Sequence, residues 1–165
     1  MKREQYEKIR GWLEERPGRL ACLRLLYRAL PPVVAAGYAV CLVFSAAVSR
    51  KLLLCNLVVP AAVFVLVTVF RAAVDLPRPY EVWKLPPLVL KDKRGRSFPS
   101  RHAASAGVIA MAWWRVSVPA GALFLIIAAG IAASRVLAGV HFVRDVAAGL
   151  ALGAGAGALA IVLGG

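Results

Sequence analysis

The sequence predicts an all-α, multi-pass transmembrane helical bundle of about five membrane helices, with an additional amphipathic helix at the N-terminus. Hydrophobic residues make up 61% of the 165 residues, and the mean hydropathy is +0.73, whereas ordinary soluble domains are nearer half apolar. Long runs carry no charge, and short stretches between them carry nearly all of it. Because about 20 apolar residues cross a bilayer as a helix, this pattern indicates several spans within one membrane domain.

Residues 1–28 are expected to form an amphipathic helix on the membrane surface, followed by the transmembrane domain of residues 29–165. Apolar side chains recur at helical spacing between basic residues, at Tyr6, Ile9, Trp12 and Leu13. Pro17 and Gly18 are expected to break this helix. A helical tail in solvent is the alternative, and the many charges argue against a secretory signal peptide.

Two uncharged runs predict the first two membrane helices. The first covers residues 29–49, a length of about 31 Å at 1.5 Å per residue. A short turn of Arg50 and Lys51 separates it from the second, at residues 52–70. Pro60 is expected to kink this second helix.

The second half of the chain alternates between a basic loop and three further apolar runs. Residues 71–101 are basic and rich in proline, which predicts an ordered loop. The third run, residues 102–114, is too short to span unless it extends into the loop or Arg115 reaches outward. Pro119 suits the first turn of the fourth helix, which runs to about Ser134.

Residues 146–164 form the last predicted membrane helix. Gly149, Gly153 and Gly157 are spaced four apart and place small residues on one face of this helix. Such a face allows close helix approach. Packing within the bundle is favoured over dimerisation, and the sequence predicts no oligomeric state.

Counting the crossings places three polar clusters and the N-terminus on the same side of the membrane. The clusters contain, in chain order, Arg71 and Arg78; then Ser97, Pro99, Ser100, Arg101 and His102; and finally Ser134, Arg135, His141, Arg144 and Asp145. Ionisable groups at a membrane boundary are costly unless they are paired or hydrated, so they indicate a functional site.

The residue types in these clusters suit phosphate chemistry. Arginine guanidinium groups match phosphate oxygens bidentately, and a helix that starts near Ser100 would add free N–H groups. His141 and Asp145 are four residues apart and would share a helix face, so the carboxylate could orient the imidazole. With His102, the chain has a candidate nucleophile and a candidate general acid. A structural His–Asp pair and topology-determining arginines are the alternatives.

No metal, cofactor or nucleic acid is predicted. Two histidines and one aspartate could bind a metal, but the surrounding arginines would repel it. The cysteines form no metal-binding or disulfide pattern, and Cys41 and Cys55 are expected to pack as small apolar side chains. The net charge of +13 could indicate nucleic-acid binding. However, the basic residues flank apolar spans, where they contact the headgroups of the bilayer.

The three clusters together resemble the type 2 phosphatidic acid phosphatase (PAP2) superfamily, which also includes soluble acid phosphatases, glucose-6-phosphatase and vanadium haloperoxidases. The resemblance covers residues 71–145 and consists of basic-x6-Arg-Pro, Pro-Ser-x-His and Ser-Arg-x5-His-x3-Asp, in this order. It implies a PAP2/haloperoxidase-like helical bundle, of whose six usual core helices five are visible. It also implies a membrane lipid phosphate phosphatase that needs no metal.

The resemblance implies a role for each matching residue. His141 would attack phosphorus and form a phosphohistidine, and Asp145 would orient His141 and stabilise its charged form. His102 would protonate the leaving oxygen and then activate water. The implied phosphate-binding residues are Arg71, Arg78, Ser100, Arg101 and Arg135.

Two positions depart from the family pattern. Arg71 stands where the family usually has lysine, which retains the charge. Arg101 stands where the family usually has glycine, a residue that lets the backbone approach phosphate closely. Arg101 could contact the phosphate or point toward a lipid headgroup, so the geometry of the phosphate site and the substrate stay open.

The expected substrate is phosphatidic acid, phosphatidylglycerol phosphate, or a polyprenyl phosphate or diphosphate. A lipid phosphotransferase with the same residues is an alternative, and so is a non-enzymatic lipid-binding membrane protein. Lysine and arginine number 18 on the side of the N-terminus and the polar clusters, against 3 on the other side. The positive-inside rule therefore favours a cytoplasmic site in the cell membrane, although many bacterial members of the family face outward.

Overall fold

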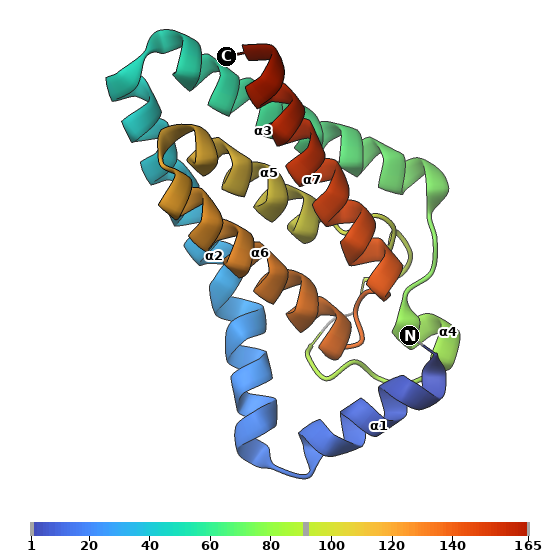
Figure 1. Ribbon diagram of the computed structural model, residues 1–165. Coiled ribbons are helices and arrows are strands. Elements are labelled where there is room, and N and C mark those ends of the chain that lie inside the picture. The colour runs from blue at the N-terminus through green and yellow to red at the C-terminus, as the bar shows by residue number, and fades with distance from the viewer. Residues whose placement is uncertain (1, 91–92, 165) are drawn as a thin grey trace.

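The computed structural model describes residues 2–90 and 93–164, and these residues form helices joined by turns and loops, without strands (Figure 1). The predicted all-α class is confirmed. The helices are α1 (Arg3–Glu14), α2 (Pro17–Val48), α3 (Arg50–Val74), α4 (Pro79–Trp83), α5 (Arg101–Val116), α6 (Val118–Leu137) and α7 (Val143–Gly164). The five long helices α2, α3, α5, α6 and α7 form a bundle, and α1 lies across one end of it.

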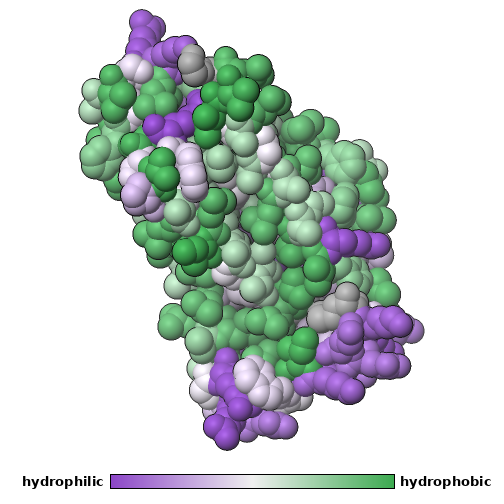
Figure 2. Space-filling model, viewed as in Figure 1, coloured by the Kyte–Doolittle hydropathy of each residue, from purple (hydrophilic) through white to green (hydrophobic). Residues whose placement is uncertain are grey.

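Four helical stretches of the described chain are long and apolar enough to cross a membrane. They are Pro17–Val48, Arg50–Trp83, Val118–Leu137 and Val143–Leu163. Figure 2 shows apolar residues over the flank of the bundle and hydrophilic residues gathered toward its ends. This distribution is that of a membrane protein, because apolar side chains contact lipid and charged ones lie at the two interfaces.

Helix α5 differs from the other long helices because most of it is buried inside the bundle. Its 16 residues include nine buried ones: Ala103, Ala104, Ala106, Gly107, Val108, Ile109, Ala110, Ala112 and Trp113. The helix extends the predicted run by one residue at its start and two at its end. The sequence analysis allowed Arg115 to reach out to the membrane surface so that this short helix could span. Instead, Arg115 donates to the Sγ of Cys55 on α3 and to the carbonyl of Ala160 on α7.

Helices α5 and α7 approach closely along the predicted small-residue face. A Cβ atom added to Gly153 would collide with the carbonyl oxygen of Ala104, and one added to Gly157 would collide with Met111. A Cβ on Gly149 would lie 3.1 Å from that of Ala103. The predicted packing of this face within the bundle is therefore confirmed. Its consequence is that the start of α5 and the start of α7 are held side by side.

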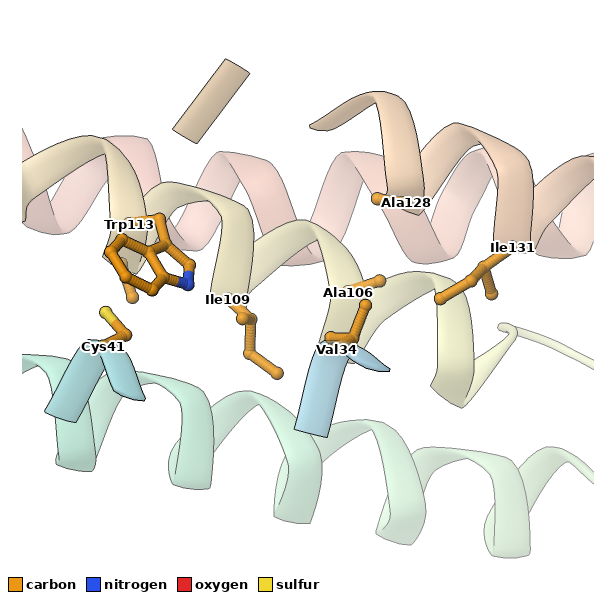
Figure 3. Packing of buried hydrophobic residues seen from close by; sticks show 8 residues of the cluster. Val34, Cys41, Ala106, Ile109, Trp113, Ala128 and Ile131 are labelled. Atoms are coloured by element: carbon orange, nitrogen blue, oxygen red, sulfur yellow. The ribbon is translucent and has the colours of Figure 1, made fainter. Parts of the chain in front are cut away.

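Helices α2, α5 and α6 share an apolar core (Figure 3). It contains Val34 and Cys41 of α2; Ala106, Ile109 and Trp113 of α5; and Ala128 and Ile131 of α6. The indole N–H of Trp113 donates to the carbonyl of Gly37 at 3.2 Å, which links α5 to α2. Cys41 is a fully buried free thiol and packs as an apolar side chain, as predicted.

The N-terminal region differs from the sequence-based expectation. Helix α1 ends at Glu14, and α2 begins at Pro17 and continues without interruption to Val48. The expected boundary between residues 28 and 29 therefore falls inside a helix. Pro17 occupies the first turn, where the missing N–H is harmless. Pro31 and Pro32, near the start of the expected first span, lie inside α2.

Helix α1 is docked on the protein itself and is not a free tail. Tyr6 is only 2% exposed and Leu13 is buried with Leu23 and Leu88. The Arg10 guanidinium donates to the carbonyl of Pro86 at 2.6 Å. Because α1 packs on the loop after α4, it covers the end of the bundle where the polar clusters lie (Figure 1).

Candidate active site

The three polar clusters lie at one end of the bundle. Arg71 is in the last turn of α3 and Arg135 is in the last turn of α6. Ser100 is the N-cap of α5, and Asp145 is in the first turn of α7. Because these helices alternate in direction, the four ends meet on the side of the bundle that α1 covers (Figure 1).

His141 and Asp145 form a buried pair with a third partner, Ser97. The Nδ1 atom of His141 lies 3.6 Å from Oδ2 of Asp145. The hydroxyl of Ser97 donates to that same Oδ2 at 2.5 Å and lies 3.4 Å from Nδ1 of His141. The backbone N–H of Phe142 also donates to Oδ2, at 3.0 Å. The carboxylate is thus held in place by three groups, one of which is the imidazole.

Ser97 is a candidate site residue to which the sequence-based prediction assigned no role. It opens the polar cluster that ends at His102, but the family resemblance assigned a role only to Ser100 among the serines of that cluster. The signal was the position of Ser97 beside the motif. Its backbone N–H donates to the carbonyl of Leu76 at 2.8 Å, and this bond helps to hold the loop before α5 beside His141.

His141 precedes α7 and does not lie on it. The sequence spacing predicted that His141 and Asp145 share one helical face, whereas α7 begins at Val143. The backbone N–H groups of Val140 and His141 both donate to the carbonyl of Arg135, at 3.1 and 3.2 Å. The turn is also fixed by the positive φ of Gly139, where a Cβ atom would collide with the Tyr6 hydroxyl.

Three buried arginines surround this pair, and backbone carbonyls hold them. Arg71, Arg78 and Arg135 are 6%, 4% and 3% exposed. Arg71 donates to the carbonyls of Ser97 and Pro99, and Arg78 donates to those of Gly95 and Val140. Among the described residues, no carboxylate lies within ion-pair distance of these three guanidinium groups. Their charges are therefore available to an anion.

Arg135 and Ser100 carry polar atoms that the protein does not satisfy. The Arg135 guanidinium lies 3.7 Å above the ring of Tyr27, and its Nε has no hydrogen-bond partner in the described structure. The hydroxyl of Ser100 is fully buried and also unpaired there. Its backbone N–H donates to the carbonyl of Asp145 at 2.8 Å. An unpaired buried hydroxyl costs about 1–3 kcal/mol, which a bound anion at this helix start would offset.

The other two predicted residues, Arg101 and His102, line a neighbouring cavity. This cavity has a volume of about 220 Å³ and is otherwise mostly apolar. Its further lining residues are Pro31, Val34, Ala35, Phe64, Ser105, Ala106, Ile109 and Ile131. The Arg101 guanidinium lies 5.7 Å from the centre of the Phe64 ring. The structure therefore places Arg71 and Arg78 near the pair of His141 and Asp145, with Arg135 near Arg78. The backbone of Ser100 contacts that of Asp145.

The burial of His141 changes its protonation behaviour. Burial lowers the pKa of His141 to about 4; the Asp145 carboxylate opposes this shift, and the charges of Arg78 and Arg71 add to it. The imidazole is then neutral at pH 7, which is the form that has a free electron pair for attack.

We expect NMR titration of the ring nitrogens to report this shift. In the substrate-free protein in detergent, His141 is expected to gain its proton only near pH 4, instead of near the ordinary value of about 6.5. The chain has 2 histidines, so the His102→Gln variant assigns both sets of resonances. A midpoint for His141 near 6.5 would contradict the buried, positively surrounded environment.

The described residues contain no group of three or more His, Cys, Asp or Glu side chains arranged to hold a metal ion. At the candidate site, the imidazole of His141 and the carboxylate of Asp145 lie near arginines.

Comparisons with known proteins place this arrangement in a family. The family model described as the PAP2 superfamily matches residues 39–164. The fold resembles that of Aquifex aeolicus LpxE, with a TM-score of 0.63 and 24% sequence identity, over 87% of this chain and 94% of that one. It also resembles a transmembrane PAP2-type phosphatidylglycerolphosphate phosphatase from Bacillus subtilis, with a TM-score of 0.55 and 20% identity, over 96% of this chain and 91% of that one. No curated protein sequence matches this chain. Since the family model covers most of the chain, including all three polar clusters, the protein belongs to the PAP2 superfamily.

Proposed function

We propose that this membrane protein is a lipid phosphate phosphatase that works through a phosphohistidine on His141. The observation that carries the proposal is the buried imidazole, neutral at pH 7, that adjoins three buried arginines without carboxylate partners. This arrangement combines a nucleophile with a site for the phosphoryl oxygens. The similarity in fold to the phosphatidylglycerolphosphate phosphatase from Bacillus subtilis supports a lipid phosphate as the substrate.

In the first half-reaction, Nε2 of His141 attacks phosphorus and the bond to the lipid oxygen breaks. His102 donates a proton to that leaving oxygen, so the lipid departs as an alcohol. The imidazole becomes cationic on phosphorylation, and Asp145 stabilises this charge through Nδ1. Arg71, Arg78 and Arg135 hold the oxygens of the transferred group while charge spreads over them.

In the second half-reaction, a water molecule attacks the phosphohistidine. His102, now neutral, takes a proton from this water. The bond between phosphorus and Nε2 breaks, its electron pair returns to the imidazole, and inorganic phosphate leaves. His102 is protonated again at the end, so the cycle consumes one water and needs no metal.

Substrate access follows from the position of the site at one end of the bundle. The apolar cavity beside Arg101 and His102 opens between α2, α3, α5 and α6, so a lipid tail can remain in an apolar environment while the phosphate reaches His141. A phosphotransferase would use the same residues and would differ only in passing the phosphoryl group to an alcohol.

The proposed side of the membrane is the cytoplasmic one, in the cell membrane. Its basis is the excess of basic residues on the side of the site, 18 against 3. Labelling of a cysteine introduced at Arg94 by an impermeant thiol reagent added outside intact cells would contradict this placement.

The decisive experiment measures phosphate release by the purified full chain in detergent with excess chelator. The panel contains phosphatidic acid, phosphatidylglycerol phosphate, a polyprenyl phosphate and diphosphate, and a soluble phosphomonoester. We expect release from at least one lipid, unchanged by chelator and faster than from the soluble ester. Loss of release on chelation would refute the metal-free reaction. Phosphate found on an added alcohol, and not free in solution, would identify a phosphotransferase.

A further inference from the structure

A second pocket, open to solvent, adjoins the site and is strongly basic. It has a volume of about 470 Å³ and is lined by Thr68, Arg71, Asp75, Arg78, Lys93, Arg94, Arg96 and Arg101. Two of these residues, Arg71 and Arg78, also reach toward His141. The other four cations come from the loop before α5 and from its first residue. Six cations and one carboxylate thus line a space much larger than one phosphate group.

The carboxylates near this pocket do not neutralise the loop cations. Asp75 accepts the backbone N–H of Arg96 at 3.0 Å. Glu81 accepts the backbone N–H of Gly95 at 3.0 Å and that of Arg78 at 2.8 Å. Both acids therefore fix the loop backbone. Within the described part of the chain, no carboxylate lies within ion-pair distance of Lys93, Arg94, Arg96 or Arg101.

The loop is held in shape while its cationic side chains stay exposed. In addition to the carboxylate contacts, Arg78 donates through Nε to the carbonyl of Gly95 at 2.9 Å, and the Tyr80 hydroxyl donates to the carbonyl of Lys93. These contacts present the cations to the same space that Arg71 and Arg78 line.

The charge of the pocket exceeds what one phosphate needs. A phosphate monoester carries a charge of about −1.5 to −2 at pH 7, which Arg71, Arg78 and Arg135 already balance. Thr68, one turn before Arg71 on α3, adds a buried hydroxyl, unpaired in the described structure, on the side of the pocket nearer the apolar cavity. The pocket therefore has both charge and hydrogen-bonding capacity for another anionic group.

The basic pocket continues into the apolar cavity through Arg101, which lines both. Along α3, Phe64 lines the apolar cavity and Thr68 lines the basic pocket one turn later. The order along this path is the apolar cavity, then Arg101, then the basic pocket, which the loop cations line together with Arg71 and Arg78. It matches an amphiphile whose tail is followed by a headgroup with more than one anionic group.

We propose that the basic pocket binds a second phosphate of the substrate, so that the enzyme prefers lipids with two phosphate groups over lipids with one. Lys93, Arg94 and Arg96 are then specificity-determining residues. The second phosphate is either linked directly to the scissile one, as in a diphosphate, or separated from it within the headgroup, as in a phosphodiester. This inference rests on the proposed function and narrows its substrate class.

The test compares substrate pairs that share a tail. Farnesyl diphosphate against farnesyl phosphate probes a directly linked phosphate, and phosphatidylglycerol phosphate against phosphatidic acid probes a separated one. We expect the Lys93→Gln/Arg94→Gln double variant to lower kcat/KM about tenfold or more for a two-phosphate lipid, because charge-assisted contacts are lost. The one-phosphate partner should change by about twofold at most. The pair that responds identifies the position of the second phosphate.

A matched control removes the same charge at the other end of the bundle. The Arg50→Gln/Lys51→Gln variant should leave both members of each pair unchanged. Equal losses for one- and two-phosphate lipids in the loop variant would overturn the proposal. A binding measurement keeps this outcome separate from a failure of the phosphatase reaction itself. By calorimetry in detergent, pyrophosphate should bind more tightly than orthophosphate, and the loop variant should lose this difference. Equal binding of the two anions by the unaltered chain would overturn the directly linked arrangement.

Discussion

Replacement of His141 by asparagine is expected to lower lipid phosphate hydrolysis by about 10⁵-fold or more, the scale seen when a covalent nucleophile is lost. Asparagine keeps polar atoms near Asp145 but offers no nitrogen that can accept the phosphoryl group. Because His141 is buried in a turn held by the carbonyl of Arg135, the variant must also be shown to fold. Its elution on size exclusion and its melting temperature in detergent should stay close to those of the unaltered chain.

The proposed covalent intermediate can be detected directly. A substrate with radioactive phosphorus should label the unaltered chain on rapid quenching, and the label should be stable in alkali and lost in acid, as a bond between phosphorus and nitrogen requires. The His102→Gln variant serves as the matched control, because loss of the residue proposed to activate water should let the label accumulate from a substrate with a good leaving group. Labelling that persists in His141→Asn would show that another residue is the nucleophile.

Replacement of Asp145 by asparagine is expected to lower kcat by about 10³–10⁴-fold, with a smaller change in KM. The carboxylate Oδ2 faces Nδ1 of His141 at 3.6 Å, and in the proposed mechanism it stabilises the cation that forms on phosphorylation. An amide has the same size but no charge, and its NH₂ group would face donors. Steady-state kinetics on the best lipid substrate measure the effect.

Two variants of residues that contact Asp145 test whether its orientation or its charge matters more for kcat. Ser97→Ala removes the hydroxyl that donates to Asp145 at 2.5 Å and should cost only about tenfold in kcat, since the carboxylate remains. Arg144→Gln removes an exposed guanidinium 3.6 Å from the other carboxylate oxygen of Asp145 and should have an effect of about twofold at most. If Asp145→Asn retained more than a tenth of the activity, the carboxylate would have no part in stabilising the phosphohistidine.

Much of the site could be predicted because the membrane restricts where charge can lie. Apolar runs of membrane length set the helices, and their alternation in direction brought Arg71, Arg135 and Asp145 to one end of the bundle without any knowledge of contacts. The spacing of Gly149, Gly153 and Gly157 likewise predicted a close helix contact, because only small residues let two helix backbones approach.

Other features depend on contacts between segments far apart in the chain. Ser97 is marked in the sequence only by its position beside the motif, and its contact with Asp145 depends on the fold of the loop before α5, which its backbone N–H ties to Leu76. The sequence also does not signal that α2 continues through Pro31 and Pro32. Proline usually interrupts a helix because it removes a backbone hydrogen bond. It is tolerated inside a membrane helix where neighbouring groups pair with the freed carbonyl.

The sequence by itself determined that this is a membrane protein, that it is a helical bundle, and that its polar groups converge at one end of the bundle. The reason is that the hydrophobicity, the length and the chain direction of each helix are properties of single segments. Only the tertiary structure decided that α1 docks over the site through Tyr6, that α5 is buried, and that backbone carbonyls hold the buried arginines. These features arise from packing, in which each group takes its partner from another helix or loop, and no periodicity within one segment encodes that choice.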